Sequence, residues 1–170
     1  DQADYFVLRL DRAEQSRTFY IDTPGGRSRR CRLDVLPVPQ FELVTVDYSY
    51  PAYTGWPANA APGKLSAAGI RALADTRVTI TGTSNVPLEQ GLLRITPGDG
   101  ATAAAPTDVT LETVSEQPNT ARGTLALSMS GRYELSLTGA DGTAGSETLS
   151  GPVVCVADKP PQVDIIEPPA

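Results

Sequence analysis

Turn-forming residues interrupt this sequence at short intervals. From Arg77 onward, clusters of Pro, Gly, Asn and Asp recur roughly every 8–15 residues and separate short apolar stretches. Within those stretches apolar and polar residues alternate, as at Tyr133, Leu135 and Leu137, so successive side chains would face a core and then water. This rhythm is typical of an all-β sandwich, because βαβ units would need helical segments between the strands.

The same pattern places the individual strands. It predicts them at residues 77–83, 92–96, 109–114, 123–129, 133–138 and 151–156. Upstream, a long strand is predicted over residues 41–50, with Val44, Val46 and Tyr48 on one face. Residues 67–74 allow a helical turn, but the stretch is short and poorly capped, so their structure stays open.

Composition excludes several classes of protein. The 170 residues include no His, so there is no His base, no Ser–His or Cys–His couple and no His metal ligand. A net charge of −6 disfavours nucleic-acid binding. No apolar run long enough to span a membrane and no signal-peptide pattern occurs. Phosphate-loop, dinucleotide and nucleophile-elbow motifs are missing too, so we expect a protein that is not an enzyme and uses no metal or cofactor.

One stretch indicates a particular kind of sandwich. The sequence G-R-Y-E-L-S-L at residues 131–137, followed by Asp141-Gly142, has the form G-x-Y-x-L-x-L…D-G. In immunoglobulin-like (Ig-like) sandwiches, a Tyr near the start of strand F packs at a corner and hydrogen-bonds backward through its hydroxyl. We therefore expect Tyr133 in the core of an Ig-like antiparallel β-sandwich.

An internal repeat predicts how the chain is divided. P-Q-F-E-L-V at residues 39–44 matches P-Q-V-D-I-I at residues 161–166, and each copy follows a strand that carries one Cys. On this basis residues 1–38 are the C-terminal strands of a preceding Ig-like module, residues 39–158 are a complete Ig-like sandwich, and residues 159–170 are a linker and the start of a following module. The alternative is that short β patterns match by chance and the whole chain forms one sandwich.

Three motifs resemble those of a bacterial family. Y-P-A-Y-T-G at residues 50–55 precedes G-I-R-A-L-A-D-T-R-V-T-I at residues 69–80, and D-K-P-P-Q-V begins at Asp158. They resemble Y-P-x-Y-T-G, G-x-I-x-A-L-x-G-T-x-V and D-x-x-P-x-V motifs of large bacterial membrane-anchored proteins with extracytoplasmic Ig-like repeats, although Asp75 stands where Gly is common. The resemblance implies an Ig-like fold, a place in the cell envelope outside the cytoplasm, and a longer parent chain. It brings no catalytic residues.

Four aromatic residues gather at Tyr48, Tyr50, Tyr53 and Trp56. In one interpretation Tyr53 and Trp56 form a platform that binds a sugar or a partner. In the other, Tyr48 and Tyr50 enter the core while Tyr53 and Trp56 pin the following loop to the sandwich. A platform needs both of the latter rings exposed and coplanar, whereas a spacer buries at least one of them.

The two cysteines, Cys31 and Cys155, allow two interpretations. A disulfide would persist in an oxidising envelope. If the two residues belong to successive modules, however, their Cα atoms are easily too far apart for a bridge, and both remain small buried thiols.

An arginine cluster follows the turn at residues 24–26 and consists of Arg27, Arg29, Arg30 and Arg32. Alternation places Arg30 and Arg32 on the face opposite Cys31 and Leu33. This favours a solvated face, paired with acids such as Asp22, over an anion site.

The sequence therefore predicts a non-catalytic structural or interaction module of a cell-envelope protein, acting as a spacer or protein-docking domain. Its partners would be proteins or neighbouring modules, with a homodimer formed by strand exchange where strands of residues 1–38 lack a partner. A carbohydrate-binding module that uses Tyr53 and Trp56 is the alternative. A hydrolase ranks last, because no pair of carboxylates stands out.

Overall fold

The computed structural model describes residues 9, 13, 15–57, 61–98 and 105–158. The chain divides into two compact units, Asp1–Pro37 (unit 1) and Val38–Ala170 (unit 2). This division lies in the proline-rich stretch where the sequence predicts a module boundary. That unit 1 ends a preceding module stays a prediction, and the linker predicted at residues 159–170 lies outside the described residues.

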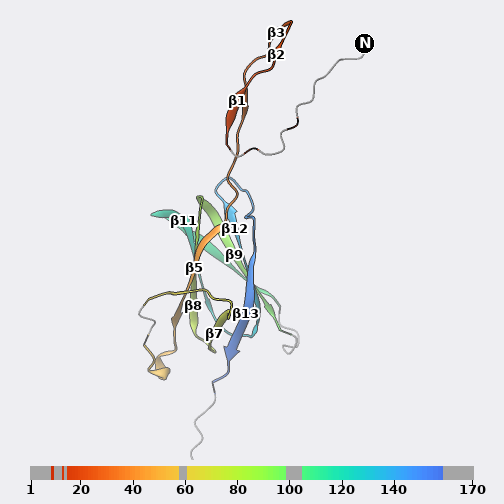
Figure 1. The fold of residues 1–170 in the computed structure, drawn as a ribbon. Helices are drawn as coiled ribbons and strands as arrows, with labels where there is room; N and C mark the ends of the chain where they lie inside the picture. Colours follow the sequence, from red (N-terminus) through yellow and green to blue (C-terminus); the bar gives the residue numbers. More distant parts are fainter. Residues whose placement is uncertain (1–8, 10–12, 14, 58–60, 99–104, 159–170) are drawn as a thin grey trace, which may run out of the picture. The chain divides into compact units, whose positions relative to one another are not determined.

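Unit 1 contains a hairpin of short strands (Figure 1). They are β1 (Arg17–Phe19), β2 (Asp22–Thr23), β3 (Gly26–Arg27) and β4 (Cys31–Leu33), with β1 antiparallel to β4 and β2 antiparallel to β3. The chain turns at Pro24 and Gly25, as predicted. Across the turn the Arg27 guanidinium donates to the Asp22 carboxylate at 2.9 Å, which confirms the expected cross-strand pairing.

Unit 2 is built on one mixed sheet that curls strongly into a half-barrel (Figure 1). Its nine strands lie in the order β6-β5-β8-β11-β10-β9-β12-β13-β7. Their bounds are β5 (Phe41–Ser49), β6 (Gly63–Lys64), β7 (Ile70–Leu73), β8 (Arg77–Ser84), β9 (Leu88–Pro97), β10 (Thr107–Val114), β11 (Gln117–Ala126), β12 (Gly131–Gly139) and β13 (Leu149–Val156). Apart from one 3₁₀ turn, η1 (Ala52–Thr54), the described residues form no helix, so the all-β prediction is confirmed.

One strand pair departs from the predicted antiparallel arrangement. β7 runs parallel to β13, with Ile70 beside Val153, so the prediction of a purely antiparallel structure is wrong at this edge. The cause is the path of the chain. It first pairs with β5 as β6 at one edge of the sheet, and then crosses to the other edge, where β7 pairs with β13. Gly69 permits the crossing, because its φ is +75° and a Cβ there would lie 2.0 Å from the Pro152 carbonyl oxygen. The undecided residues 67–74 therefore contain a strand and no helical turn.

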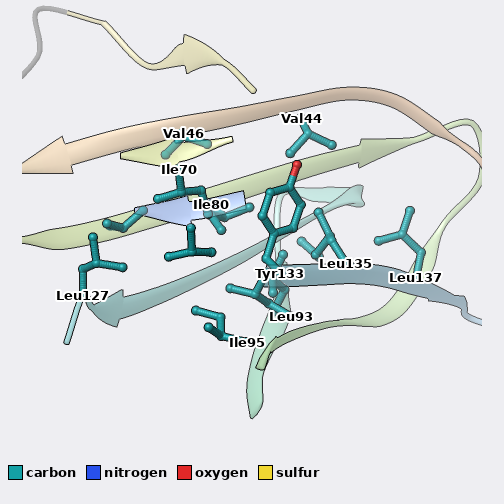
Figure 2. Packing of buried hydrophobic residues seen from close by; sticks show 14 of the residues in the cluster. Val44, Val46, Ile70, Ile80, Leu93, Ile95, Leu127, Tyr133, Leu135 and Leu137 are labelled. Carbon is teal, nitrogen blue, oxygen red and sulfur yellow. The ribbon is translucent and has the colours of Figure 1, made fainter. Parts of the chain in front are cut away.

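The core lies inside the curl of the sheet. Figure 2 shows inward side chains of β5, β8, β9 and β12 gathered in one cluster. This follows from the alternation, since every second residue of a strand faces the same side. The buried apolar residues are Val44, Val46, Ile70, Ala72, Val78, Ile80, Leu88, Leu93, Ile95, Leu111, Ala121, Leu127, Tyr133, Leu135, Leu137 and Val153.

We predict that Leu135→Ala lowers the free energy of unfolding by about 2–5 kcal/mol, because it removes a fully buried side chain and leaves a cavity. Urea denaturation followed by circular dichroism measures the loss. The matched control is Glu134→Ala, at the exposed neighbouring position of β12, which should change stability by less than about 0.5 kcal/mol. Equal losses in the two variants would contradict the assignment of the inward face.

Candidate functional site

The aromatic residues singled out in the sequence lie where β5 leaves the sheet. Tyr48 belongs to β5, and Pro51 leads into the 3₁₀ turn η1. Gly55 ends the turn with a φ of 64°, in the left-handed region that favours glycine. The Thr54 hydroxyl donates to the Pro51 carbonyl at 2.8 Å and accepts the Trp56 N–H at 3.2 Å, so the loop is fixed by its own hydrogen bonds.

The four rings form a graded series from half-buried to exposed. Tyr48 and Tyr50 pack against the margin of the core and stack, with ring centroids 6.3 Å apart. Trp56 meets Tyr50 edge to face at 5.1 Å, which holds the indole in place. Tyr53 and Trp56 nevertheless remain 67% and 57% exposed. The exposure that a binding platform requires is therefore present. Neither ring is buried, so the expectation that a spacer buries at least one of them is wrong, although Trp56 does contact Tyr50 at the margin of the core.

Two carboxylates lie near the Tyr53 phenol. Hydrogen bonding to Asp158 raises the pKa of Tyr53, with smaller contributions from burial and from the charges of Asp158 and Asp75. Asp75 itself adopts a φ of 63° between β7 and β8. The aromatic loop is thus coupled to the residues that follow β13, a connection that the sequence alone does not reveal.

The two cysteines are free thiols and belong to different units. A disulfide between them stays a prediction. The Cys155 amide donates to the Ser130 hydroxyl at 2.9 Å, and its thiol approaches the Leu127 carbonyl oxygen at 3.9 Å. Burial raises the pKa of the Cys155 thiol, and the charge of Asp75 raises it further.

A groove of about 320 Å³ opens between the start of β5 and the start of β13. Residues 64–67, which follow the start of β6, also line it. Apolar and charged side chains both line it, including Phe41, Glu42, Val44, Lys64, Leu65, Glu147 and Leu149. The sequence gives no signal for this groove, because its walls come from separate segments that only the fold brings together.

Tyr133 forms the inner wall of that groove. Its side chain points toward Val44 (Figure 2), and the residue is only 4% exposed, so its predicted place in the core is confirmed. The ring covers Gly151, where a Cβ would lie 2.8 Å from a ring carbon. Burial raises the pKa of the phenol. Among the hydrogen bonds of the described residues none involves this hydroxyl, so the backward bond expected at the corner is not seen.

The described part of the chain carries neither a metal-ligand cluster nor a membrane-spanning helix. Those residues contain no group of three or more His, Cys, Asp or Glu side chains placed to hold a metal ion. Within the same residues, no helix has the length and apolar character needed to cross a bilayer.

We predict that Asp158→Asn lowers the pKa of Tyr53 toward the ordinary value for tyrosine, because the neutral amide no longer disfavours the phenolate. The folded chain holds this proton more tightly than the unfolded chain, so the stabilisation is complete below the ordinary tyrosine pKa and is lost as pH rises above it. Titration of tyrosinate absorbance measures the shift. Asp22→Asn in unit 1 is the control, and a titration curve identical to the parent in both variants would contradict the contact.

We predict that Asp75→Asn speeds alkylation of Cys155 at mildly alkaline pH. Removing the carboxylate charge lowers the pKa of the thiol, so more thiolate is present. The rate of iodoacetamide labelling is measured in a Cys31→Ser background, where Cys155 is the only remaining thiol. Asp141→Asn, at an exposed turn, serves as the control. An unchanged labelling rate in Asp75→Asn would show that its charge does not reach the sulfur.

No family model matches the chain, and no curated protein matches it either. What the protein does is therefore inferred from its fold, its repeat and its surface.

Proposed function

We propose that this chain is a non-catalytic Ig-like module, with flanking pieces of its neighbours, from an extracytoplasmic protein of the bacterial cell envelope. It acts as a spacer or a protein-docking domain in a tandem array. Its mechanism is mechanical, since folded modules joined by short proline-rich segments set the reach and stiffness of the parent chain.

The strand order supports the Ig-like part of this proposal. In Ig constant-type domains the two sheets have the orders A-B-E-D and C-F-G. Here β5-β8-β11-β10 and β9-β12-β13 follow those two orders, with β10 paired to both β9 and β11. β7, added in parallel beside β13, extends the second half.

The resemblance to the bacterial repeat family gains support from Asp75. That residue stands where the family pattern commonly has Gly, and its φ of 63° lies in the left-handed region that Gly adopts most easily. Asp is among the few other residues that tolerate this conformation. The departure from the pattern is therefore compatible with the same backbone. The cell-envelope location rests on this resemblance.

The observation that carries the proposal is the position of the repeat relative to the two units. The chain divides between Pro37 and Val38, immediately before the first P-Q copy. C-R-L-D at residues 31–34 precedes that copy, and C-V-A-D at residues 155–158 precedes the second. The sequence C-x-x-D, a proline-rich stretch and a P-Q motif thus occur twice in the same order.

Unit 1 indicates where such a chain would meet partners. Phe19, Tyr20 and Ile21 are 38%, 46% and 48% exposed on a small hairpin. Two-stranded hairpins are marginally stable alone, so a neighbouring module or a second copy would cover this surface. Strand exchange between copies is one form of that association.

A polyprotein with several copies of residues 1–158 in series tests the spacer function. Each unit 2 should unfold in a separate event under force, and each event should release about 400 Å of chain, from about 120 residues at roughly 3.5 Å each. Single-molecule force spectroscopy measures this. The control polyprotein carries Leu135→Ala in one copy, which should unfold first because its core is weakened. One cooperative event for the whole polyprotein would contradict independent modules.

The alternative function is a carbohydrate-binding module. The exposure of Tyr53 and Trp56 favours it, because sugar rings stack on open aromatic faces. This function requires both rings to be free in the folded chain.

A further inference from the structure

The groove beside β5 is walled by two strand segments that lack a neighbour on one edge. β5 pairs with β6 only at Thr45 and Val46, so residues 41–43 have no strand beside them on that edge in the described part of the chain. β13 pairs with β7 only from Val153 onward, and no described strand lies on the same edge of residues 149–152. Both segments contribute residues to the groove. Unpaired edges of this kind are templates for another strand.

The backbone of β13 turns its hydrogen-bonding groups at Ser150 toward the unpaired edge. Within a strand, the N–H and C=O groups of every second residue point to the same side. The Val156 carbonyl accepts the N–H of Ala74, which directly follows β7, at 2.9 Å. Counting back by twos from Val156 therefore places the N–H and C=O of Ser150 on the β7 side. No backbone group outside the sheet, among the described residues, bonds to them there.

On the β5 wall, a side chain already takes the place of a strand. The Phe41 N–H donates to the Glu147 carboxylate at 3.3 Å, and both residues line the groove. Glu147 thus supplies the acceptor that the carbonyl of a neighbouring strand would supply. The bond is longer than the usual 2.7–3.2 Å of N–H···O hydrogen bonds, so a strand carbonyl can replace it.

The inner wall of the groove holds a buried polar group without a partner. Tyr133 is 4% exposed, lines the groove and reaches toward Val44 (Figure 2). None of the hydrogen bonds between described residues involves its hydroxyl. Leu65 and Leu149 line the same groove. A hydroxyl set among apolar side chains favours a ligand that brings one hydrogen-bonding group together with apolar surface.

Size and charge narrow the occupant to an extended, basic peptide. The groove encloses about 320 Å³. One turn of a helix, about 10 Å across and 5.4 Å long, already fills more than that volume, whereas a single extended segment is thinner. The charged side chains that line the groove are Glu42, Glu147 and Lys64. Two carboxylates against one ammonium group favour a positively charged partner.

We propose that this groove binds an extended segment of a partner protein, which pairs with the open edge of β13 at Ser150. An apolar side chain of the segment lies over Tyr133, whose hydroxyl hydrogen-bonds to the segment. A basic side chain meets Glu42 and Glu147. The main chain of the segment supplies the affinity and its alternate side chains supply the specificity. This inference rests on the proposed protein-docking function, and it names the site and the kind of partner.

Strand pairing is tested with a fluorescein-labelled hexapeptide of alternating valine and lysine, whose fluorescence anisotropy with the full chain measures binding. Two further peptides carry methyl groups on the backbone nitrogens of the valines or of the lysines. One of these sets faces the β13 edge, so we expect one methylated peptide to bind at least about tenfold more weakly. Equal affinity for all three peptides overturns the strand pairing.

Hydrogen exchange followed by NMR reports the pairing at β13 directly. Bound peptide should slow exchange of the Ser150 amide, because that N–H gains an acceptor. The amide of Leu149, which pairs with Leu135 of β12, is the matched control and should not change. Unchanged exchange at Ser150 with the peptide bound overturns the assignment to this edge.

Tyr133→Phe tests whether the peptide occupies the groove. The variant keeps the ring and loses only the hydroxyl, so we expect about fivefold weaker binding with the fold retained, which circular dichroism and thermal unfolding check. The matched control is Tyr48→Phe, the same change at a half-buried tyrosine outside the groove, which should leave the affinity unchanged. Equal affinities of the parent and Tyr133→Phe overturn the groove as the binding site.

Glu42→Gln tests the charge preference at an exposed position that the fold does not need. At low ionic strength it should weaken binding about twofold, because one attractive charge is lost. Glu116→Gln, in the turn between β10 and β11, is the control and should have no effect. Equal losses in the two variants overturn the charge contact in the groove, since they show attraction to the acidic surface as a whole.

A second copy of the chain is the competing occupant. Analytical ultracentrifugation with and without the peptide separates the two cases. Peptide binding that leaves the oligomeric state unchanged supports a partner protein. A dimer that the peptide dissociates overturns it, because a strand of the second copy then fills the groove.

Failure of this docking site and failure of the spacer function remain distinguishable. If no peptide binds while the polyprotein still unfolds module by module, only the docking site is wrong. If the peptide binds as expected while the polyprotein unfolds in one event, the docking site stands and the spacer function falls.

Discussion

Strand β10 is paired along both of its edges, and the architecture of unit 2 depends on this double pairing. One edge is bonded to β9 over six residue pairs, from Thr107 to Glu112, and the other is bonded to β11. Two separate sheets would be held together by side-chain packing alone. Here a continuous ladder of hydrogen bonds runs from β6 to β7. The enclosed core, the groove beside β5 and the position of the aromatic loop all follow from that continuity.

Alternation in the sequence predicts the long strands because their inward residues are deeply buried. Val78 and Ile80 in β8, or Leu135 and Leu137 in β12, are almost fully shielded from water, so the period of two is strong. The same signal is weak in β7, which has only four residues. Its parallel pairing depends on Gly69 fitting against Pro152, and residues so distant in sequence carry no local pattern that would reveal the contact.

The candidate site also combines features that the sequence reveals with features that appear only in the folded chain. Tyr53 and Trp56 can be recognised from the sequence because they are close neighbours in a short aromatic run. The influence of Asp75 and Asp158 on Tyr53 exists only once β7 and β13 lie side by side. Likewise, the alternation places Tyr133 in the core, but its contact with Gly151 follows from the register between β12 and β13. Sequence reasoning thus identifies local chemistry and misses what the strand register assembles.

The parallel pairing of β7 with β13 has a consequence for how the protein is made. The paired residues Ile70 and Val153 are 83 positions apart, so this contact closes a very long loop and forms slowly compared with the hairpins. During synthesis the chain emerges from its N-terminus, and β7 then waits as an unpaired edge until β13 has left the ribosome. Throughout that interval the nascent chain exposes a strand able to pair with a neighbour. Any element that covers this unfinished edge during synthesis would therefore lower the risk of such mispairing.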